Sequence, residues 1–152
     1  MVRQGSFHLI SYTRKFMATG LCAALACLAG RAAGEAVALP VDAATTINGI
    51  ELACTGVGQT RDEARWRAYP IRVEFSNARN EYLVGGAITL RDAAGRELLS
   101  ASCDAPWILL RLPKGAYRVE GRILGSAATG RSAPFLSPAA GQARVVLQFP
   151  DA

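Results

Sequence analysis

Short runs in which apolar and polar residues alternate constrain this chain more than any other feature of its sequence. In the clearest run, Ile71, Val73 and Phe75 alternate with polar residues, and residues 108–112 and 117–123 repeat the pattern. A period of two is typical of a strand with one buried face. About seven such segments, separated by turn residues, predict an all-β chain folded as an antiparallel β-sandwich, transthyretin-like or Ig-like, with a closed barrel as the alternative.

Turn residues between these runs indicate where the expected strands end. In "DAAG", Asp92 opens a hairpin by capping it with its side chain, and Gly95 closes it with a positive φ. In "LPKGAYRV", Pro113 fixes φ at the first central position, Gly115 is expected to supply a positive φ, and Tyr117 re-enters the core. These five residues therefore explain the chain's turns and are not expected to form a binding site.

One short helix interrupts the strand pattern. Thr60 and Glu63 have the spacing of a capping box, in which each side chain bonds to the other residue's backbone. This spacing predicts a helix near residues 61–68, ended by Pro70.

Glycine-rich stretches indicate two further features. The adjacent glycines at 85–86 suggest a bulge or a close approach to the backbone. Residues 125–141 are rich in Gly, Ala, Ser and Pro, and predict a long loop with a short edge strand at 132–136.

The first residues have the order of an export signal. Arg14 and Lys15 precede the apolar stretch 16–30, which has the length of a signal-peptide core, and an A-x-A site follows at 36–38. We therefore assign 1–38 to a signal peptide and its cleavage region. Two alternatives stay open: an uncleaved anchor, and a lipid attached to Cys27 in the lipobox-like "ALAC".

Export sets the expectations for the rest of the chain. Small, weakly patterned residues predict a flexible leader over 39–46, followed by the β-sandwich domain at 47–152. The mature protein would be periplasmic or secreted, with no membrane span. In such an oxidising compartment Cys54 and Cys103, the cysteines outside the signal, are expected to form a disulfide, and two buried free thiols are the alternative.

Missing residue types exclude several functions. The single histidine, His8, lies in the signal segment, as do both methionines, so the usual imidazole-dependent triads and zinc sites cannot be assembled. We predict no catalytic residue, metal or cofactor. Residues 39–152 carry 13 Lys+Arg and 11 Asp+Glu, a net 13 − 11 = +2, which is too little to predict a nucleic-acid partner.

Two stretches carry a resemblance to a known family. "ITLRDAAGRELL" (88–99) and "PWILLRLPKGAYRVEGRI" (106–123) resemble the carboxypeptidase regulatory-like, or transthyretin-like (prealbumin-like), domain found in small exported proteins of Gram-negative bacteria. The similarity covers about residues 49–123. It implies an accessory module that binds proteins, glycans or envelope components without catalysis. The hydroxyisourate hydrolase of the same architecture relies on histidines and a C-terminal Tyr-Arg-Gly-Ser, and this chain has neither, ending in "QFPDA".

A disulfide would also locate a candidate binding edge. Joining the two cysteines holds Gly56 and Gly58 beside Asp104 and Trp107, which would place glycine backbone, a carboxylate and an indole at one edge of the sandwich. Trp107 also begins the apolar run "WILLRL", which favours a core position instead. The sequence thus predicts a non-catalytic module for a protein or glycan of the cell envelope, with a structural or assembly component of the envelope as the alternative.

Overall fold

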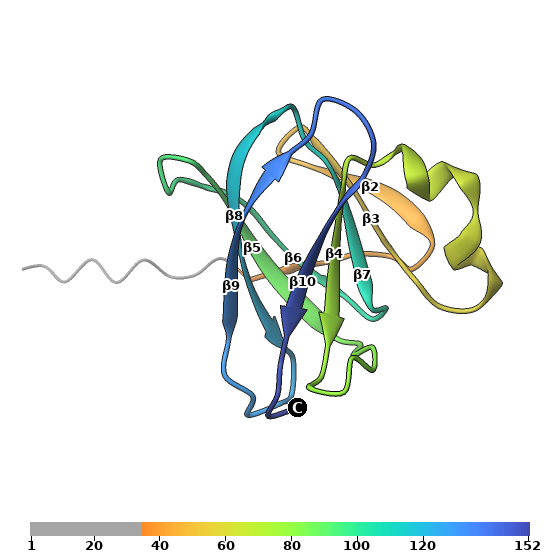
Figure 1. Cartoon of the computed structure of the whole chain (residues 1–152), viewed down its shortest axis with the longest axis vertical. Helices are drawn as coiled ribbons and strands as arrows, with labels where there is room; N and C mark the ends of the chain where they lie inside the picture. Colours follow the sequence, from red (N-terminus) through yellow and green to blue (C-terminus); the bar gives the residue numbers. More distant parts are fainter. Residues whose placement is uncertain (1–34) are drawn as a thin grey trace, which may run out of the picture. The chain divides into compact units, whose positions relative to one another are not determined.

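The computed structural model describes residues 35–152, which form a sandwich of two five-stranded sheets (Figure 1). Most of the expected signal segment, Cys27 included, lies outside the described residues. Within residues 35–152 no helix is long and apolar enough to cross a membrane. Sheet 1 contains, in spatial order, β1 (Val37–Ala38), β6 (Glu97–Cys103), β5 (Gly86–Asp92), β8 (Gly115–Ile123) and β9 (Arg131–Ser137). Sheet 2 contains β10 (Ala143–Gln148), β4 (Ile71–Ser76), β7 (Trp107–Arg111), β3 (Ile50–Thr55) and β2 (Ala43–Ile47).

The β-sandwich expected from the sequence is confirmed, with two corrections to its details. It contains ten strands instead of about seven. Most strand pairs are antiparallel, but β1 pairs with β6, and β10 with β4, in parallel. The first and last strands of the described chain thus each join a sheet beside a strand that runs in the same direction. Alternation along a single strand carries no information about such pairings.

The core lies between the sheets and is filled by the apolar residues of each alternating run. On β4, Ile71, Val73 and Phe75 are fully buried in this core. The Phe75 ring packs directly on the backbone of β5, where a Cβ added to Gly86 would lie 2.4 Å from the ring. This is the close approach that the paired glycines suggested, since no other residue fits here. Phe149, after the last strand, stacks on Phe75 with ring centroids 6.3 Å apart.

The flexible leader expected over residues 39–46 is instead part of the sandwich. Leu39 is only 6% exposed, and its backbone N–H donates to the Ser102 carbonyl at 2.9 Å. Strand β2 pairs along its full length with β3 through a tight turn at Asn48 and Gly49, whose φ angles of 50° and 80° are those of a two-residue hairpin. The small Ala and Thr residues of β2 show no alternation of apolar and polar side chains. The segment is held in place by its pairing with β3, which its own sequence does not indicate.

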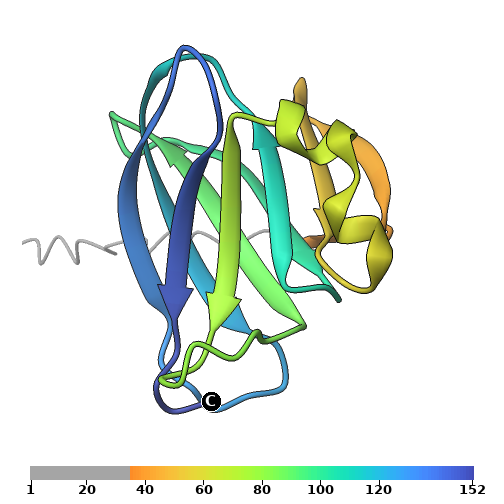
Figure 2. The same cartoon turned by 45° about the vertical axis from the view of Figure 1, so that its right-hand side comes forward.

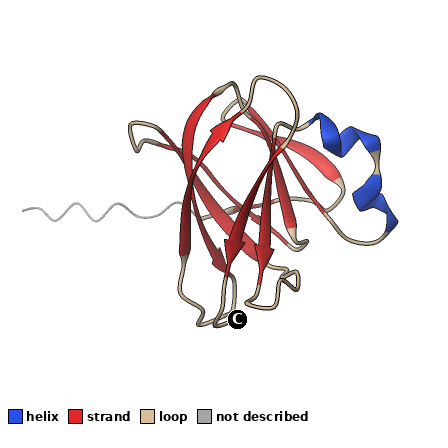
Figure 3. Cartoon of the chain, in the orientation of Figure 1, coloured by secondary structure: helices blue, strands red, loops and turns tan. Residues whose placement is uncertain are grey.

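The helix expected near 61–68 is replaced by two 3₁₀ turns, η1 (Gln59–Asp62) and η2 (Ala64–Ala68), which lie on one side of the sandwich (Figures 2 and 3). The capping box is not formed, because the Thr60 hydroxyl donates to the Asp42 carboxylate at 2.9 Å. Buried Trp66 fixes the turns by packing on the outer side of sheet 2, in a small cluster with three other residues, Ala53, Tyr69 and Leu109. Tertiary contacts thus override the local helix signal.

The two expected turns differ in outcome. The hairpin Asp92–Gly95 is confirmed, with Gly95 at φ 81° and its N–H bonded to the Asp92 carbonyl at 2.9 Å. Gly115, however, does not have the positive φ expected of it, because it already belongs to β8. What fixes this turn is Tyr117, whose hydroxyl donates to the Pro113 carbonyl at 3.1 Å. The Tyr117 ring packs beside Gly115 on one side and stacks on Phe135, 5.8 Å away, on the other.

Candidate functional site

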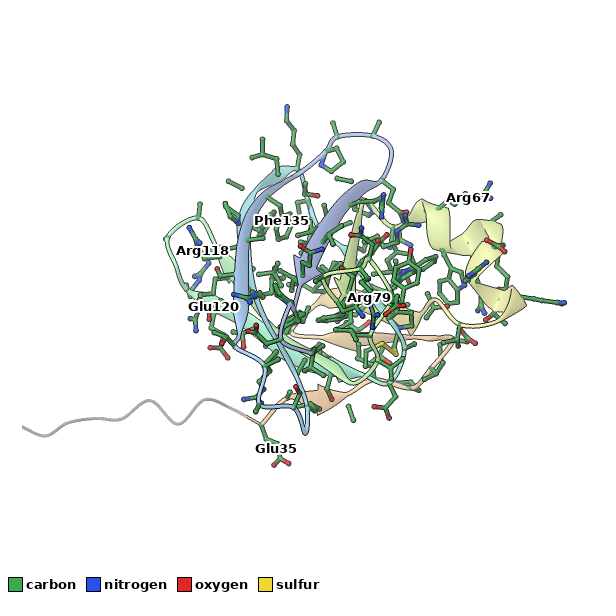
Figure 4. All side chains as sticks on the ribbon, turned by 60° about the horizontal axis from the view of Figure 1, so that its bottom comes forward. Glu35, Arg67, Arg79, Arg118, Glu120 and Phe135 are labelled. Carbon is green, nitrogen blue, oxygen red and sulfur yellow. A yellow bond between two sulfur atoms is a disulfide. The ribbon has the colours of Figure 1, made fainter. Side chains whose placement is uncertain are left out.

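The disulfide expected from the sequence is present and joins the two sheets. Cys54 on β3 and Cys103 on β6 are bonded at 2.08 Å, with their Cα atoms 5.5 Å apart, and the bond is drawn in yellow in Figure 4. Both cysteines are buried in the core. The bond lies next to the loops that carry the predicted binding edge, so the position of each edge residue can be examined in turn.

The structure brings together only part of that edge. Gly56 lies against the indole of Trp107, where a Cβ would be 2.7 Å from Cδ2, and its φ of 109° also requires glycine. Trp107 is 7% exposed, so its ring is not an open platform for a ligand. Gly58 and Asp104 are exposed, and within residues 35–152 no hydrogen bond or ion pair links the Asp104 carboxylate to the other three residues. Gly56 and Trp107 therefore pack against each other and do not form an open binding surface.

Charged and aromatic side chains cover the remaining sides of Trp107. The Arg72 guanidinium lies 4.5 Å from its ring centroid, and the Tyr82 ring meets it edge-on at 5.9 Å. Arg72 is held there by Glu74, whose carboxylate lies 2.7 Å from the arginine Nε. Arg144 on β10 donates two hydrogen bonds to the same carboxylate, from Nε at 2.8 Å and from Nη2 at 2.6 Å.

This ion triad is part of the framework of sheet 2. Glu74 is 1% exposed, and a buried carboxylate is tolerated only when it is paired. Its hydrogen bonds, and then its charge, raise the pKa of Arg144. The triad thus fixes the guanidinium of Arg72 over the indole.

A second perturbed group lies at the other end of this face. Burial, followed by the neighbouring Glu51 carboxylate, raises the pKa of Tyr69 to about 12. The Tyr69 phenol in turn lowers the pKa of Glu51, with Arg111 adding to the effect. Arg111 lies over the Tyr69 ring at 4.6 Å and bonds to Glu51 at 3.2 Å. At neutral pH the phenol stays protonated and the carboxylate charged, so the pair stabilises the strand ends and carries no titration near pH 7.

The outer face of sheet 1 has a different character, because the 3₁₀ turns lie on the side of sheet 2 (Figures 2 and 3). An open groove of about 380 Å³ crosses this face. Side chains at its centre form a row across four neighbouring strands: Ser100, Thr89, Glu120 and Ser132 occupy paired positions on β6, β5, β8 and β9. Neighbouring strands are about 4.8 Å apart, so the row offers a polar group at each such interval. We call this feature the hydroxyl groove.

The hydroxyl groove is hollow because small residues form its floor. Ala87 and Gly130 contribute little or no side chain there, and Gly121 adds only backbone, since a Cβ on it would point into the core against Leu147. Its walls carry both signs of charge, with the carboxylates of Glu97 and Glu120, and the guanidiniums of Arg122 and Arg131. Glu120 is one of the residues labelled in Figure 4.

The two carboxylates of the groove are held by one arginine. Arg91 reaches Glu120 at 3.2 Å and Glu97 at 3.3 Å. The Thr89 and Ser100 hydroxyls lie 3.5 Å apart, and Ser100 also donates to the Ile88 carbonyl. The polar groups of the groove are therefore positioned before any ligand arrives.

Sequence reasoning missed this groove. Its hydroxyls occupy the polar positions of alternating strands, and alternation indicates only that these positions face outward. The signal that could have found it is the small size of these outward residues, since a solvated strand face more often carries long charged side chains.

The described residues offer no evident metal site. Within residues 35–152, no three His, Cys, Asp or Glu side chains come together as metal ligands would. Comparison with models of known protein families and with curated proteins finds no match.

Proposed function

We propose that this chain is an exported, non-catalytic module of a bacterial cell envelope that binds a glycan in the hydroxyl groove. The observation that carries the proposal is the row of polar side chains across four strands of sheet 1, in a groove with a floor of small residues. A groove of this kind gives a hydroxylated ligand both close approach and hydrogen-bonding partners.

The chemistry of the groove favours a glycan over a protein. Protein interfaces depend on buried aromatic and apolar anchors. The side chains that rise around this groove are hydroxyls, carboxylates and guanidiniums. Carboxylates accept hydrogen bonds from sugar hydroxyls, and guanidiniums donate to sugar oxygens. The groove is lined by two carboxylates and two guanidiniums, and Glu97, Glu120 and Arg131 already have ion-pair partners, which favours a ligand without strong charge.

The disulfide supports the proposed compartment. Structural disulfides persist in secreted and periplasmic proteins and are rare in the reducing cytosol of mesophiles. The order of basic residues, apolar stretch and A-x-A site before residue 39, together with the resemblance to carboxypeptidase regulatory-like domains, supports the same location.

Glycan binding is tested with purified envelope polysaccharides and variants of the groove. Thr89→Val removes one hydroxyl and keeps a β-branched side chain, and Glu120→Gln removes one charge. Each variant should weaken binding by about fivefold or more, as loss of a hydrogen bond to a buried or charged partner does. Thr46→Val on β2, an exposed position of sheet 2, is the matched control and should bind as the unaltered chain does. Equal binding by all four proteins would contradict the groove as the site.

Export is tested separately by fractionation of expressing cells and N-terminal sequencing. We expect a shortened chain in the periplasm or the medium. Recovery of the full-length chain in the cytoplasm with Cys54 and Cys103 reduced would contradict the proposed location.

A further inference from the structure

On the opposite side of the sandwich, a small pocket lies between the 3₁₀ turns and sheet 2. It has a volume of about 120 Å³ and is lined by Arg61, Arg67, Arg72, Trp66, Trp107 and Gln142, together with Asp62 and Leu109. Three arginines against one aspartate give the lining an excess of positive charge. Among residues 35–152, Asp62 forms an ion pair only with its neighbour Arg61, at 3.7 Å, and its side chain is largely exposed.

Two of the three arginines have donors to spare. Arg72 forms an ion pair with Glu74, 2.7 Å from its Nε, but this Nε has no hydrogen-bond partner among the described residues, and the side chain lines the pocket over Trp107. Arg67 is exposed on η2, where Figure 4 labels it, and forms no ion pair with any residue in 35–152. Guanidinium groups present pairs of N–H donors that match the oxygens of carboxylates and phosphates.

A second observation points to a missing acceptor. Trp107 is more than nine-tenths buried, and its indole Nε1 has no hydrogen-bond partner among the described residues. An indole nitrogen can only donate, and leaving a buried donor without an acceptor costs about 1–3 kcal/mol. The same tryptophan lines the arginine pocket.

We infer that this pocket binds a small oxyanion, namely the carboxylate or phosphate group of a small ligand. The anion accepts hydrogen bonds from Arg67 and Arg72. Nε1 of Trp107 has almost no accessible surface, so it donates to the anion only once the side chains over it shift. Glu74, which is also paired with Arg144, holds the guanidinium of Arg72 in position. This site is separate from the hydroxyl groove, which lies on the other sheet, and does not depend on the proposed glycan.

The chain provides its own reporter, because its two tryptophans, Trp66 and Trp107, both line the pocket. The full chain is titrated with sodium phosphate, and separately with sodium acetate, at an ionic strength held constant with sodium chloride. A saturable change in tryptophan fluorescence with either anion is expected, and the two titrations distinguish phosphate from carboxylate. Absence of a saturable change with both anions would overturn the inference.

Variants decide whether the pocket itself binds the anion. Arg67→Gln changes an exposed residue without an ion pair and should weaken binding by about tenfold, the equivalent of about 1.4 kcal/mol. Lys114→Gln removes the same charge at an exposed position outside both the pocket and the hydroxyl groove, and should leave affinity unchanged. If both variants weaken binding equally, the effect is one of overall charge and the site is refuted.

The donor of Trp107 has its own test. Trp107→Phe keeps an aromatic ring but removes the N–H, and Trp66 still reports. We expect weaker anion binding by the folded variant. Loss of the larger indole, which packs against Gly56 and Arg72, also lowers thermal stability, so affinity is measured well below the unfolding temperature. Unchanged anion affinity would refute the role of this donor.

Discussion

Replacing both cysteines of the disulfide by alanine should remove a large part of the stability of the sandwich. Cys54 and Cys103 are separated by 49 residues, and in the chain-entropy model a cross-link over that distance restricts the unfolded chain by about 4 kcal/mol. Both side chains are buried, so Cys54→Ala with Cys103→Ala also leaves a small cavity that costs about 1 kcal/mol more. We therefore expect a total loss of about 5 kcal/mol.

The assay is unfolding by urea, followed by circular dichroism, for three forms of the protein. The oxidised chain is compared with the alanine pair and with the unaltered chain kept reduced. The reduced chain keeps both sulfur atoms and loses only the cross-link, so its loss of about 4 kcal/mol isolates the entropic part. At a typical slope of about 2 kcal/mol per molar urea, the midpoint falls by about 2 M. A reduced chain within 1 kcal/mol of the oxidised one would refute this reasoning.

Three further changes test other parts of the structure. Gly86→Ala places a Cβ 2.4 Å from the Phe75 ring and should cost about 1–3 kcal/mol in urea unfolding, less when Phe75 is replaced by leucine; a loss that Phe75→Leu does not reduce would contradict the contact. The pKa of Tyr69 is raised to about 12 in the folded chain, so the folded state keeps a proton that the unfolded state releases above its ordinary pKa near 10. The free energy of unfolding should therefore fall between pH 10 and 12, by at most about 1.4 kcal/mol per pH unit, and Tyr69→Phe should lack this fall. A chain that starts at Leu39 loses β1 and should be about 1–2 kcal/mol less stable in thermal unfolding than one that starts at Glu35; equal stability would show that β1 contributes nothing.

The parts of the fold that the sequence predicted correctly are those determined by neighbours in the chain. Residues 71–76 alternate, and form β4. Asp92 and Gly95 have the chemistry of a hairpin turn, and β5 and β6 meet there. The edge strand expected at 132–136 appears as β9, Arg131–Ser137. The disulfide followed from counting the cysteines outside the signal segment.

The parts that could not be predicted depend on partners far along the chain. Asp42 bonds to the hydroxyls of Thr55 at 2.6 Å and Thr60 at 2.9 Å, which ties β2 to the start of η1, yet nothing near Asp42 in sequence shows this. The hydroxyl groove exists only through the register of four strands. Trp107 is buried, but beside Leu109 on the outer side of sheet 2 instead of between the sheets, and Arg72, which covers its ring, comes from another strand.

The bond between Cys54 and Cys103 also determines how the chain responds to force. A force applied to the two ends of the chain can extend the segments before β3 and after β6. It cannot extend the residues that the disulfide encloses. The sequence separation of 49 between the two cysteines corresponds to about 170 Å of fully extended chain that is never released. If one end is attached to the envelope while the groove holds a glycan, the domain can lengthen by unravelling β10, which carries no residue of the groove, while β4 and β5 stay within the closed loop.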